Sequence, residues 1–422
     1  MSVQRFIPIV ADLKQEFLSK SLEHLVSRPE EKEIDLGSKL AQVVIGVRRC
    51  GKSTLCRKVL REAKVKAAYI NFDDERLADL ATENLNEILE ATYFVYGDFD
   101  YLLLDEIQNV DCWPLFVNRL LRQNLHLIVT GSNAKLLSNE LMTHLTGRHH
   151  KIELYPFSFK DFAEAKKVDL NRLSTKGIAE AKRCLDEYLF QGGFPELLAE
   201  NDRRDYIAGL FEAIIKRDIS LRFKIRYPEI LYKLASYCVD NFAREINTTK
   251  LADEFGVSSQ TISTYLNYLK EAFLLLNTPK FSYKSIERIR PGKYYVIDNA
   301  FVSERDNSFA PIDLGWRLEN TILIELYRRA ANEHNEIFFY KDKTFEIDFV
   351  VTQYGKVRQL IQVCLDIDNE KTRQREIKAL THGRKKFNCT DLTLITFHND
   401  ETVTIDADCS IKIISAVNWL NA

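Results

Sequence analysis

The stretch AQVVIGVRRCGKSTLCRKVLREA, residues 41–63, decides the fold of the first part of the chain. It starts with an apolar run typical of a buried strand, crosses a loop with two glycines and continues with helical spacing. Within it, Gly46 to Ser53 match the pattern GxxxxGK followed by Ser or Thr, in the strand-to-helix context that this pattern requires. The sequence therefore predicts a phosphate-binding loop from Gly46 to Thr54.

The spacing of this loop suits a nucleoside triphosphate. Glycine lets the backbone turn its N–H groups onto phosphates at the start of a helix, where the helix dipole also favours anions. We expect Lys52 to contact the β and γ phosphates, Ser53 to coordinate Mg²⁺ and Thr54 to contact the α phosphate. The predicted nucleotide-binding residues are Gly46, Val47, Arg48, Arg49, Cys50, Gly51, Lys52, Ser53 and Thr54.

A second motif favours hydrolysis of the nucleotide. The segment YLLLDE, residues 101–106, is an apolar strand that ends in two acids, the Walker B pattern. Asp105 would hold the metal through water, and Glu106 would orient and polarise the attacking water as a general base. Two acids after a strand are often only a solvated strand end, but their place downstream of the phosphate-binding loop favours the catalytic interpretation.

Short apolar runs alternate with amphipathic stretches from residue 41 onward, which predicts a parallel sheet covered by helices. The run LHLIVTGSNAK, residues 125–135, would place Ser132 and Asn133 at the carboxyl edge of that sheet, where ligands of α/β sheets bind. Either residue could touch the γ phosphate or the water, or could cap a helix. Arg148 follows Gly147 on a short turn. It could stabilise transferred charge within the chain or from a neighbouring subunit, or form a surface ion pair.

The motifs GVRRCGKST, LLLDEIQNVDCW, LIVTGSN, LTGRHHKIELYPFSFKDF and QGGFPE resemble a large group of bacterial and archaeal AAA+ type ATPases. In that group a P-loop domain is followed by a helical region, a winged helix and an uncharacterised C-terminal domain, so the resemblance covers nearly the whole chain. ATP rather than GTP rests on this resemblance, since no NKxD signature follows the last core strand. The implied ATPase residues are Lys52, Ser53, Asp105 and Glu106, with Ser132 or Asn133 at the sensor 1 place and Arg148 as the Gly-Arg arginine.

The next part of the chain carries a helix-turn-helix pattern. Residues 247–276 have the outline of two helices around a Gly-containing turn, and YKSIERIRPGKYYVID, residues 283–298, is expected to form a β-hairpin wing. The recognition helix would run from residue 258 to 270, although it is poor in Arg and Lys and could serve only packing or oligomerisation. The residues that could contact duplex DNA are Ser258, Ser259, Gln260 and Thr261 on the helix, and Lys284, Arg288, Arg290 and Lys293 on the wing.

The C-terminal segment resembles a PD-(D/E)xK nuclease-like fold. Glu319 lies on an expected helix, Glu346-Ile-Asp348 on a strand, and Gln362-Val-Cys364 stands where an acid-x-Lys motif usually appears. Intact versions hold Mg²⁺ between acids while a lysine helps to activate water. Without this lysine we expect a nucleic-acid or protein surface rather than DNA cleavage, although Asp348 and Glu319 could still touch a metal.

Length and composition agree with a multidomain protein. At 422 residues the chain is too long for one ordinary core. Lys plus Arg total 59 against 61 Asp plus Glu, which argues against a protein that coats nucleic acid over its whole surface and still allows a local basic patch. The predicted parts are an N-terminal helical lead-in (1–40), a P-loop ATPase core (41–160), a helical lid-like region (161–240), a winged helix (241–310) and a nuclease-like domain (311–422).

The sequence also bears on location and redox state. No stretch approaches the roughly 18 apolar residues of a membrane span, and the N-terminus lacks the order of a secretory signal. We therefore expect a cytoplasmic protein without a membrane partner. The eight cysteines are scattered without a CxxC pair or zinc-ligand spacing, so we expect reduced thiols, with Cys50 as a small filler in the loop.

Together these features predict an α/β protein that binds and hydrolyses ATP with Mg²⁺ and acts as a molecular switch on DNA or a protein partner. The partner could also be a second copy of the chain, in a homo-oligomer. Two alternatives remain open from the sequence. One is a nucleotide-binding scaffold with little turnover, and the other is an ATP-dependent nuclease.

Overall fold

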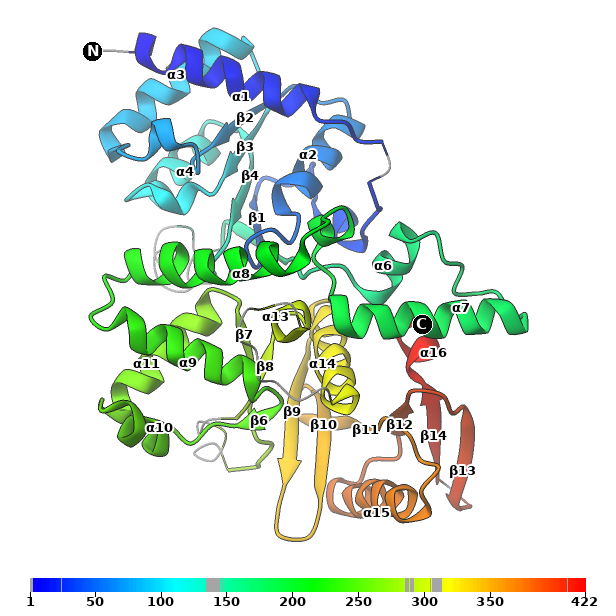
Figure 1. Cartoon of the computed structure of the whole chain (residues 1–422). Helices are drawn as coiled ribbons and strands as arrows, with labels where there is room; N and C mark the ends of the chain where they lie inside the picture. Colours follow the sequence, from blue (N-terminus) through cyan, green and yellow to red (C-terminus); the bar gives the residue numbers. More distant parts are fainter. Residues whose placement is uncertain are drawn as a thin grey trace. The chain divides into compact units, whose positions relative to one another are not determined.

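The computed structural model describes residues 3–23, 25–133, 145, 147–284, 288, 292–303, 305, 313–407 and 409–422 (Figure 1). The chain divides into two compact units. Unit 1 is Met1–Leu154 with Glu271–Phe273, and unit 2 is Tyr155–Lys270 with Leu274–Ala422. The predicted division into five parts stays a prediction.

A parallel sheet is the frame of unit 1. Within the described residues it has five strands in the order β2-β3-β4-β1-β5, and every neighbouring pair is parallel. This confirms the predicted α/β fold class and places β4 between β1 and β3. The strands are β1 (Ala41–Ile45), β2 (Ala67–Asn71), β3 (Tyr101–Asp105), β4 (His126–Gly131) and β5 (His149–Glu153).

The burial of these strands explains which of them the sequence reveals. Strands β1, β3 and β4 are buried along almost their whole length, as expected for apolar runs covered on both faces. Sequence patterning does not reveal β5, because its HHKIE segment is polar and only Ile152 is buried. An edge strand needs no continuous apolar run, since one side of it has no neighbouring strand to pack against.

Four α-helices accompany this sheet in the described part of unit 1. The apolar face of the first helix, α1, consists of Ile9, Val10, Leu13 and Phe17, and the helix packs against α3 and β2 (Figure 1). It ends at Ser19, so it fills only part of the predicted lead-in. The helices are α1 (Ile7–Ser19), α2 (Lys52–Glu62), α3 (Leu85–Tyr96) and α4 (Trp113–Arg122).

Unit 2 opens with helices. Ser158 caps the first of them as its sequence context suggests, because its hydroxyl accepts from Asp161 N at 3.1 Å while Asp161 Oδ2 accepts from Ser158 N at 2.9 Å. Gly192, at φ 73°, ends α7. The helices of this part are α6 (Phe159–Ala165), α7 (Thr175–Gln191), α8 (Arg203–Ala213), a π-helical continuation (Ile214–Leu221) and α9 (Pro228–Asp240).

A small antiparallel sheet follows, and two further helices lie between its first and second strands in the chain. Its strands run in the order β6-β8-β7. Within the described residues β8 pairs with β7 and β6, so the hairpin that includes β8 extends back to residue 275 and is not confined to the expected residues 283–298. Residues 285–287 and 289–291, including Arg290, lie outside the described residues. The elements are β6 (Arg244–Glu245), α10 (Thr248–Phe255), α11 (Ser259–Glu271), β7 (Leu275–Thr278) and β8 (Lys293–Val296).

A larger sheet completes unit 2. Within the described residues it has six strands in the order β13-β14-β12-β11-β10-β9, and its core includes Ile347, Leu360, Leu380 and Ile411, all fully buried. Helix α15 packs against β10, β11 and β12. The elements are α13 (Ala300–Ser303), α14 (Leu314–Glu333), β9 (Asn335–Lys341), β10 (Glu346–Gln353), β11 (Lys356–Val363), α15 (Glu370–Phe387), β12 (Leu392–Thr396), β13 (Glu401–Asp406), β14 (Cys409–Ser415) and α16 (Ala416–Asn421).

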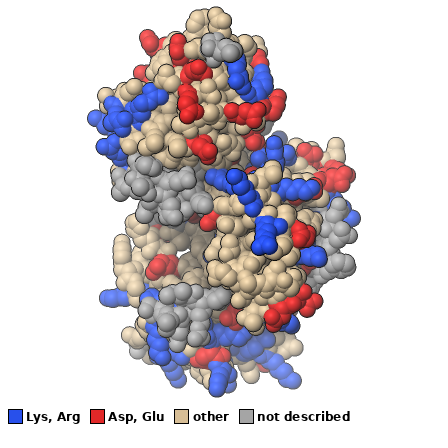
Figure 2. Space-filling model, turned by 90° about the vertical axis from the view of Figure 1, so that its left-hand side faces the viewer, with Lys and Arg blue, Asp and Glu red and all other residues tan. Residues whose placement is uncertain are grey.

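The surface charge, the apolar character of the helices and the state of the cysteines can be compared with what the composition predicts. Acidic and basic side chains are interspersed over much of the face in Figure 2, and Lys and Arg gather along its lower edge. Among the described helices, none combines the length and apolar character needed to cross a bilayer. All eight cysteines are free thiols, and burial raises the pKa of the Cys50 thiol, which agrees with a filler role.

Candidate functional site

The phosphate-binding loop leaves the carboxyl end of β1 and leads into α2. Gly46 has no room for a side chain, because a Cβ there would lie 2.0 Å from the main-chain oxygen of Leu154. Gly51 has a φ of 100°, in the left-handed region that glycine adopts without strain. The two glycines of the motif therefore meet two separate physical demands, a close backbone approach and a left-handed turn.

Lys52 is the first residue of α2, and its side chain turns back across the loop. Its ammonium donates to the main-chain oxygens of Gly46 and Val47, each at 3.1 Å, and lies 3.5 Å from Glu106 Oε1. The side chain is only 4% exposed. A buried cation is thus held inside the loop, at the place where the β and γ phosphates of a nucleotide are expected.

Asp105 ends β3 and meets the loop through Ser53. Ser53 Oγ donates to Asp105 Oδ1 at 2.8 Å, so the two predicted metal-binding side chains lie side by side. Burial is the main cause that raises the pKa of Asp105, and the neighbouring Glu106 raises it further. Hydrogen bonds from Thr130 and Ser53 lower it again, which favours the charged carboxylate.

Two residues that the sequence did not single out complete the surroundings of Asp105. Thr130 Oγ1 donates to Asp105 Oδ1 and accepts from Glu106 N at 3.1 Å. Tyr69, on β2, donates its hydroxyl to Asp105 Oδ2 at 3.1 Å. Both belong to strands that flank β3 in the sheet, so only the strand order brings them to the acid.

Glu106 follows β3 in a left-handed conformation, with a φ of 52°. Such a backbone is costly for a residue other than glycine and occurs preferentially at functional sites. The carboxylate accepts from Ser132 N at 3.1 Å and from the side-chain amide of Gln108. Burial alone would raise the pKa of Glu106, but Lys52 and the bond from Gln108 bring it below the ordinary value. Glu106 is therefore ionised, as a general base must be.

The remaining predicted site residues differ in how deeply they are buried. Ser132 and Asn133, at the end of β4, are buried, at 2% and 0% exposure, and Ser132 reaches the acidic pair through its main chain. Arg48 pairs with Asp73 at 3.2 Å, whereas Arg49 is exposed and Thr54 is half-buried on α2.

The loop is also held from outside the motif. Arg28, only 7% exposed, donates to the main-chain oxygen of Cys50 at 3.2 Å and pairs with Glu30 at 3.3 Å. No sequence motif marked Arg28, which lies in the charged stretch before β1. Its contact with the loop shows that this stretch supports the site.

Arg148 is not brought to this group within the chain. It is exposed, donates to Asn118 Oδ1 at 2.8 Å and precedes β5. Its main-chain oxygen accepts from Ala41 N at 3.0 Å, so it lies at the amino ends of β1 and β5. The phosphate-binding loop leaves the opposite end of β1, about 15 Å away for a strand of this length.

The assembled residues fit a nucleoside triphosphate with Mg²⁺. Mg²⁺ is usually held by one or two carboxylate or hydroxyl oxygens together with phosphate oxygens and water. Ser53 and Asp105 supply such oxygens beside the buried ammonium of Lys52. Because residue 46 is a glycine, no Cβ covers the loop backbone at that point.

The predicted DNA-contact residues belong to unit 2. Ser258, Ser259 and Gln260 are exposed at the start of α11, where Ser258 Oγ accepts from Thr261 N at 3.1 Å as a helix cap. The expectation that Lys293 is exposed on a wing is wrong. Its side chain is 8% exposed and pairs with Glu319 and Glu346, because β8 lies inside the domain rather than at a hairpin tip.

Comparison with known proteins gives two domain matches. Residues 38–163 match the model of the AAA domain, and residues 182–307 match a domain of unknown function, DUF8612. The first match contains the whole group from Gly46 to Arg148. The second begins within α7 and contains the described elements from α8 to α13, including α10 and α11.

Full-length relatives and a solved structure are also similar. An uncharacterized protein of Methanocaldococcus jannaschii is 35% identical over 402 residues, which cover 92% of this chain and 89% of that protein. An uncharacterized protein of Haemophilus influenzae is 30% identical over 408 residues, which cover 90% and 94%. A Walker-type ATPase of Pyrococcus abyssi is similar in structure with a TM-score of 0.45 and 16% identity, over 66% of this chain and 95% of that chain.

Proposed function

Since the chain belongs to the family of AAA-domain proteins that includes these archaeal and bacterial relatives, we propose that it binds ATP with Mg²⁺ and hydrolyses it. The observation that carries this proposal is the linked group at the carboxyl edge of the sheet. Lys52 pairs with Glu106, and Ser53 is bonded to Asp105. A cation, the two side chains expected to hold the metal and an ionised carboxylate thus lie together, which supports the proposal.

The role of each residue follows from its present contacts. Lys52 exchanges its two main-chain acceptors for the β and γ phosphate oxygens and stabilises the charge of the transferred phosphoryl group. Ser53 and Asp105 hold Mg²⁺, which neutralises phosphate charge when bound. Thr54 contacts the α phosphate. Glu106 orients the attacking water and accepts its proton.

The contact between Lys52 and Glu106 gives substrate binding a second effect. In the chain as described, Lys52 helps to hold the pKa of Glu106 below its ordinary value. When Lys52 turns to the phosphates, that influence weakens and Glu106 becomes a stronger base. The base is therefore most effective when ATP is in place.

The same carboxylate supports a molecular switch. Glu106 accepts a hydrogen bond from Ser132 N at the end of β4. A water or phosphate that binds Glu106 would therefore also affect the position of Ser132 and Asn133. Loss of the γ phosphate would release this contact, as occurs where nucleotide state orders nearby segments. Ser132 or Asn133 would then report the nucleotide state to the chain that follows.

A winged helix would provide a DNA-binding surface for this switch. Supporting this proposal, unit 2 has the element order α9, β6, α10, α11, β7, β8, with β8 in the centre of its small sheet. The start of α11 exposes Ser258, Ser259 and Gln260, side chains able to contact base edges. Exposed Lys284 and Arg288 could contact phosphates without sequence preference.

Arg148 supports a homo-oligomer. Because it lies at the edge of the sheet opposite the phosphate-binding loop, we assign it a role in a neighbouring subunit's site rather than in its own. An arginine supplied across an interface stabilises charge on the transferred phosphoryl group.

Phosphate release from ATP tests the proposal. Wild type is compared with Lys52→Ala and Glu106→Gln, each with and without mixed-sequence duplex DNA. Lys39→Ala and Glu90→Gln are matched controls, because both residues are exposed and lie outside the linked group. We expect turnover to fall about 100-fold or more in the first two variants, the scale of losing a general base or an electrostatic contact, and to remain in the controls.

Two results would change this conclusion. Wild-type turnover no faster than that of Glu106→Gln, together with tight ATP binding, would leave a nucleotide-binding scaffold. Turnover that is lost in both variants but does not respond to DNA would keep the ATPase and point to a protein partner.

A further inference from the structure

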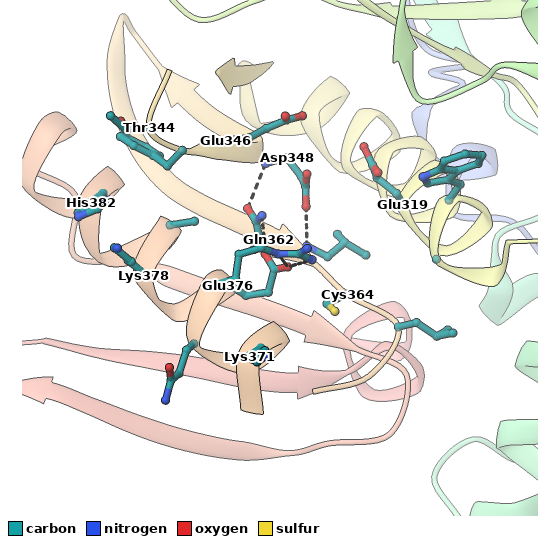
Figure 3. Close-up of a pocket in the computed structure, with 18 of the residues that line it drawn as sticks. Glu319, Thr344, Glu346, Asp348, Gln362, Cys364, Lys371, Glu376, Lys378 and His382 are labelled. Atoms are coloured by element: carbon teal, nitrogen blue, oxygen red, sulfur yellow. Dashed lines mark hydrogen bonds and ion pairs between the residues drawn. The ribbon is translucent and has the colours of Figure 1, made fainter. Parts of the chain in front are cut away.

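A pocket of about 780 Å³ in unit 2 contains the acidic residues of the nuclease-like pattern (Figure 3). Glu319 comes from α14, Glu346 and Asp348 come from β10, and Gln362 comes from β11. The predicted acids are therefore brought together. In a nuclease-like fold this is where Mg²⁺ would be held.

A lysine from another element lies among these acids. Lys293, the first residue of β8, places its ammonium 2.8 Å from Glu346 Oε1, 3.3 Å from Glu319 Oε1 and 4.0 Å from Asp348 Oδ1. Burial by itself would lower the pKa of Lys293, but the carboxylates raise it above the ordinary value. The side chain therefore stays charged although it is only 8% exposed.

Other hydrogen-bond donors also contact the cluster. Tyr295 donates its hydroxyl to Glu319 Oε1 at 2.7 Å, and Asp348 Oδ2 accepts from Val363 N at 2.9 Å. Gln362 Oε1 accepts from Asp348 N at 3.2 Å (Figure 3). These contacts use the same oxygens that a metal ion would need.

The side-chain amide of Gln362 and the carboxylate of Glu376 on α15 also have polar partners. Gln362 Nε2 donates to Glu376 Oε2 at 2.7 Å (Figure 3). Glu376 Oε1 pairs with Arg375 at 2.5 Å. Among the described residues, no three His, Cys, Asp or Glu side chains are placed to hold a metal ion. The residues present thus do not fit the Mg²⁺ that a nuclease-like pattern implies.

The position of Lys293 explains how the cluster is stable without a metal. Buried carboxylates are costly unless paired, and an internal ammonium with three N–H donors can compensate several of them. Because Lys293 lies on β8 and its partners lie on α14 and β10, the same contacts join the small sheet to the larger one.

We propose that Lys293 takes the place of a divalent cation in this cluster and closes it to metal ions. The cluster is then a fixed ionic junction within unit 2, and a metal site remains latent beneath the lysine. Removal of the ammonium leaves the oxygens of Glu319, Glu346 and Asp348 around the space that it filled, while Glu346 keeps its pair with Lys341 at 2.8 Å. Oxygen donors arranged in this way suit a hard cation.

Tb³⁺ luminescence tests this proposal in the full-length chain without nucleotide. Trp316 lines the pocket and can sensitise a lanthanide bound there. Wild type, Asp348→Asn, Lys293→Met, Lys293→Gln and the double variant Lys293→Met/Asp348→Asn are titrated with Tb³⁺. Lys371→Met is the matched control, because Lys371 lines the same pocket but is exposed.

We expect wild type, its Asp348→Asn variant and Lys371→Met to give the same low emission. Either substitution of Lys293 should raise the affinity for Tb³⁺ about tenfold or more, because one opposing charge is removed within contact distance of the carboxylates. Adding Asp348→Asn should reverse this gain. Any Tb³⁺ bound at the phosphate-binding loop is common to all these variants and cancels in the comparison.

Two outcomes would overturn the proposal. One is wild-type emission that Asp348→Asn abolishes, which would mean that the cluster already binds a cation beside Lys293. The other is a Lys293 variant that keeps the circular dichroism of wild type and gains no Tb³⁺ affinity. If neither Lys293 variant folds, the comparison of wild type with Asp348→Asn still decides the matter.

Discussion

Thr130→Val should weaken both the stability of unit 1 and its metal-dependent turnover. Thr130 is fully buried and serves both acids, since its hydroxyl donates to Asp105 and accepts from Glu106 N. Valine has nearly the same shape, so the substitution removes the hydroxyl and leaves no cavity. A buried carboxylate oxygen loses a donor and a buried N–H loses its acceptor.

The expected loss of stability can be worked from these two contacts. A hydrogen bond to a charged group contributes about 1.5–3 kcal/mol, and a buried unsatisfied N–H costs about 1–3 kcal/mol, so a total near 3 kcal/mol is expected. For a unit of this size that lowers the melting temperature by about 6–12 °C. Hydrogen exchange of the peptides that contain β3 and β4 should increase in the same variant, which localises the effect.

The pH dependence gives an independent readout. The bond from Thr130 lowers the pKa of Asp105, whose pKa is already raised by burial. Its loss raises that pKa further, so more acid is protonated at a given pH and less can hold Mg²⁺. The acid side of the turnover profile should therefore move to higher pH, and excess Mg²⁺ should partly restore the rate.

Thr92→Val is the matched control for this prediction. Thr92 is also fully buried in unit 1, but its hydroxyl donates to the main-chain oxygen of Ile88 within α3 and touches neither acid. We expect a loss below about 1.5 kcal/mol and an unchanged pH profile. The reasoning is refuted if Thr130→Val matches Thr92→Val in melting temperature, turnover and pH profile.

Three further predictions concern other residues. Gly46→Ala should abolish ATP binding, measured by calorimetry, because its Cβ would meet the oxygen of Leu154 at 2.0 Å; Gly209→Ala, where no atom lies within 4 Å, should bind normally. Burial raises the pKa of Asp298 to about 7, so the folded chain binds this proton more tightly than the unfolded chain does. Urea unfolding should show stability falling from about pH 4 to about pH 7, with a flatter slope in Asp298→Asn. Arg148→Ala and Glu106→Gln should each lose turnover and recover it when mixed, because one subunit supplies the arginine and the other the base; no recovery would exclude the role across an interface.

The sequence singled out the phosphate-binding loop and the two acids because their signals are local. The loop from Gly46 to Thr54 is set by a turn that only glycines at fixed spacing permit, and Asp105 and Glu106 follow directly from an apolar strand. Thr130, Tyr69 and Arg28 could not be predicted in the same way. Each reaches the site from a segment that is distant in sequence, and the strand order that brings it there is not written in any short motif.

Errors arose where charge was taken as a sign of exposure. Lys293 stands in a basic stretch and was expected on a solvated wing, yet it is buried because acids from two other elements compensate it. The polar strand β5 was missed for a related reason, since its edge position does not require apolar residues. Local composition indicates the free energy needed to bury a segment's charged and polar side chains. The partners that offset this free energy come from other parts of the fold.

Lys52 and Lys293 show how the partners of a buried lysine separate two roles. Lys52 donates to two neutral main-chain oxygens and lies 3.5 Å from one carboxylate. An incoming triphosphate carries more negative charge than these partners, so it can draw the ammonium away from them. Lys293 lies within 4.0 Å of three carboxyl groups on two elements, and moving it would take their shared lysine partner from Glu319 and Asp348. The first lysine is therefore available to a ligand, whereas the second has already taken the place of one.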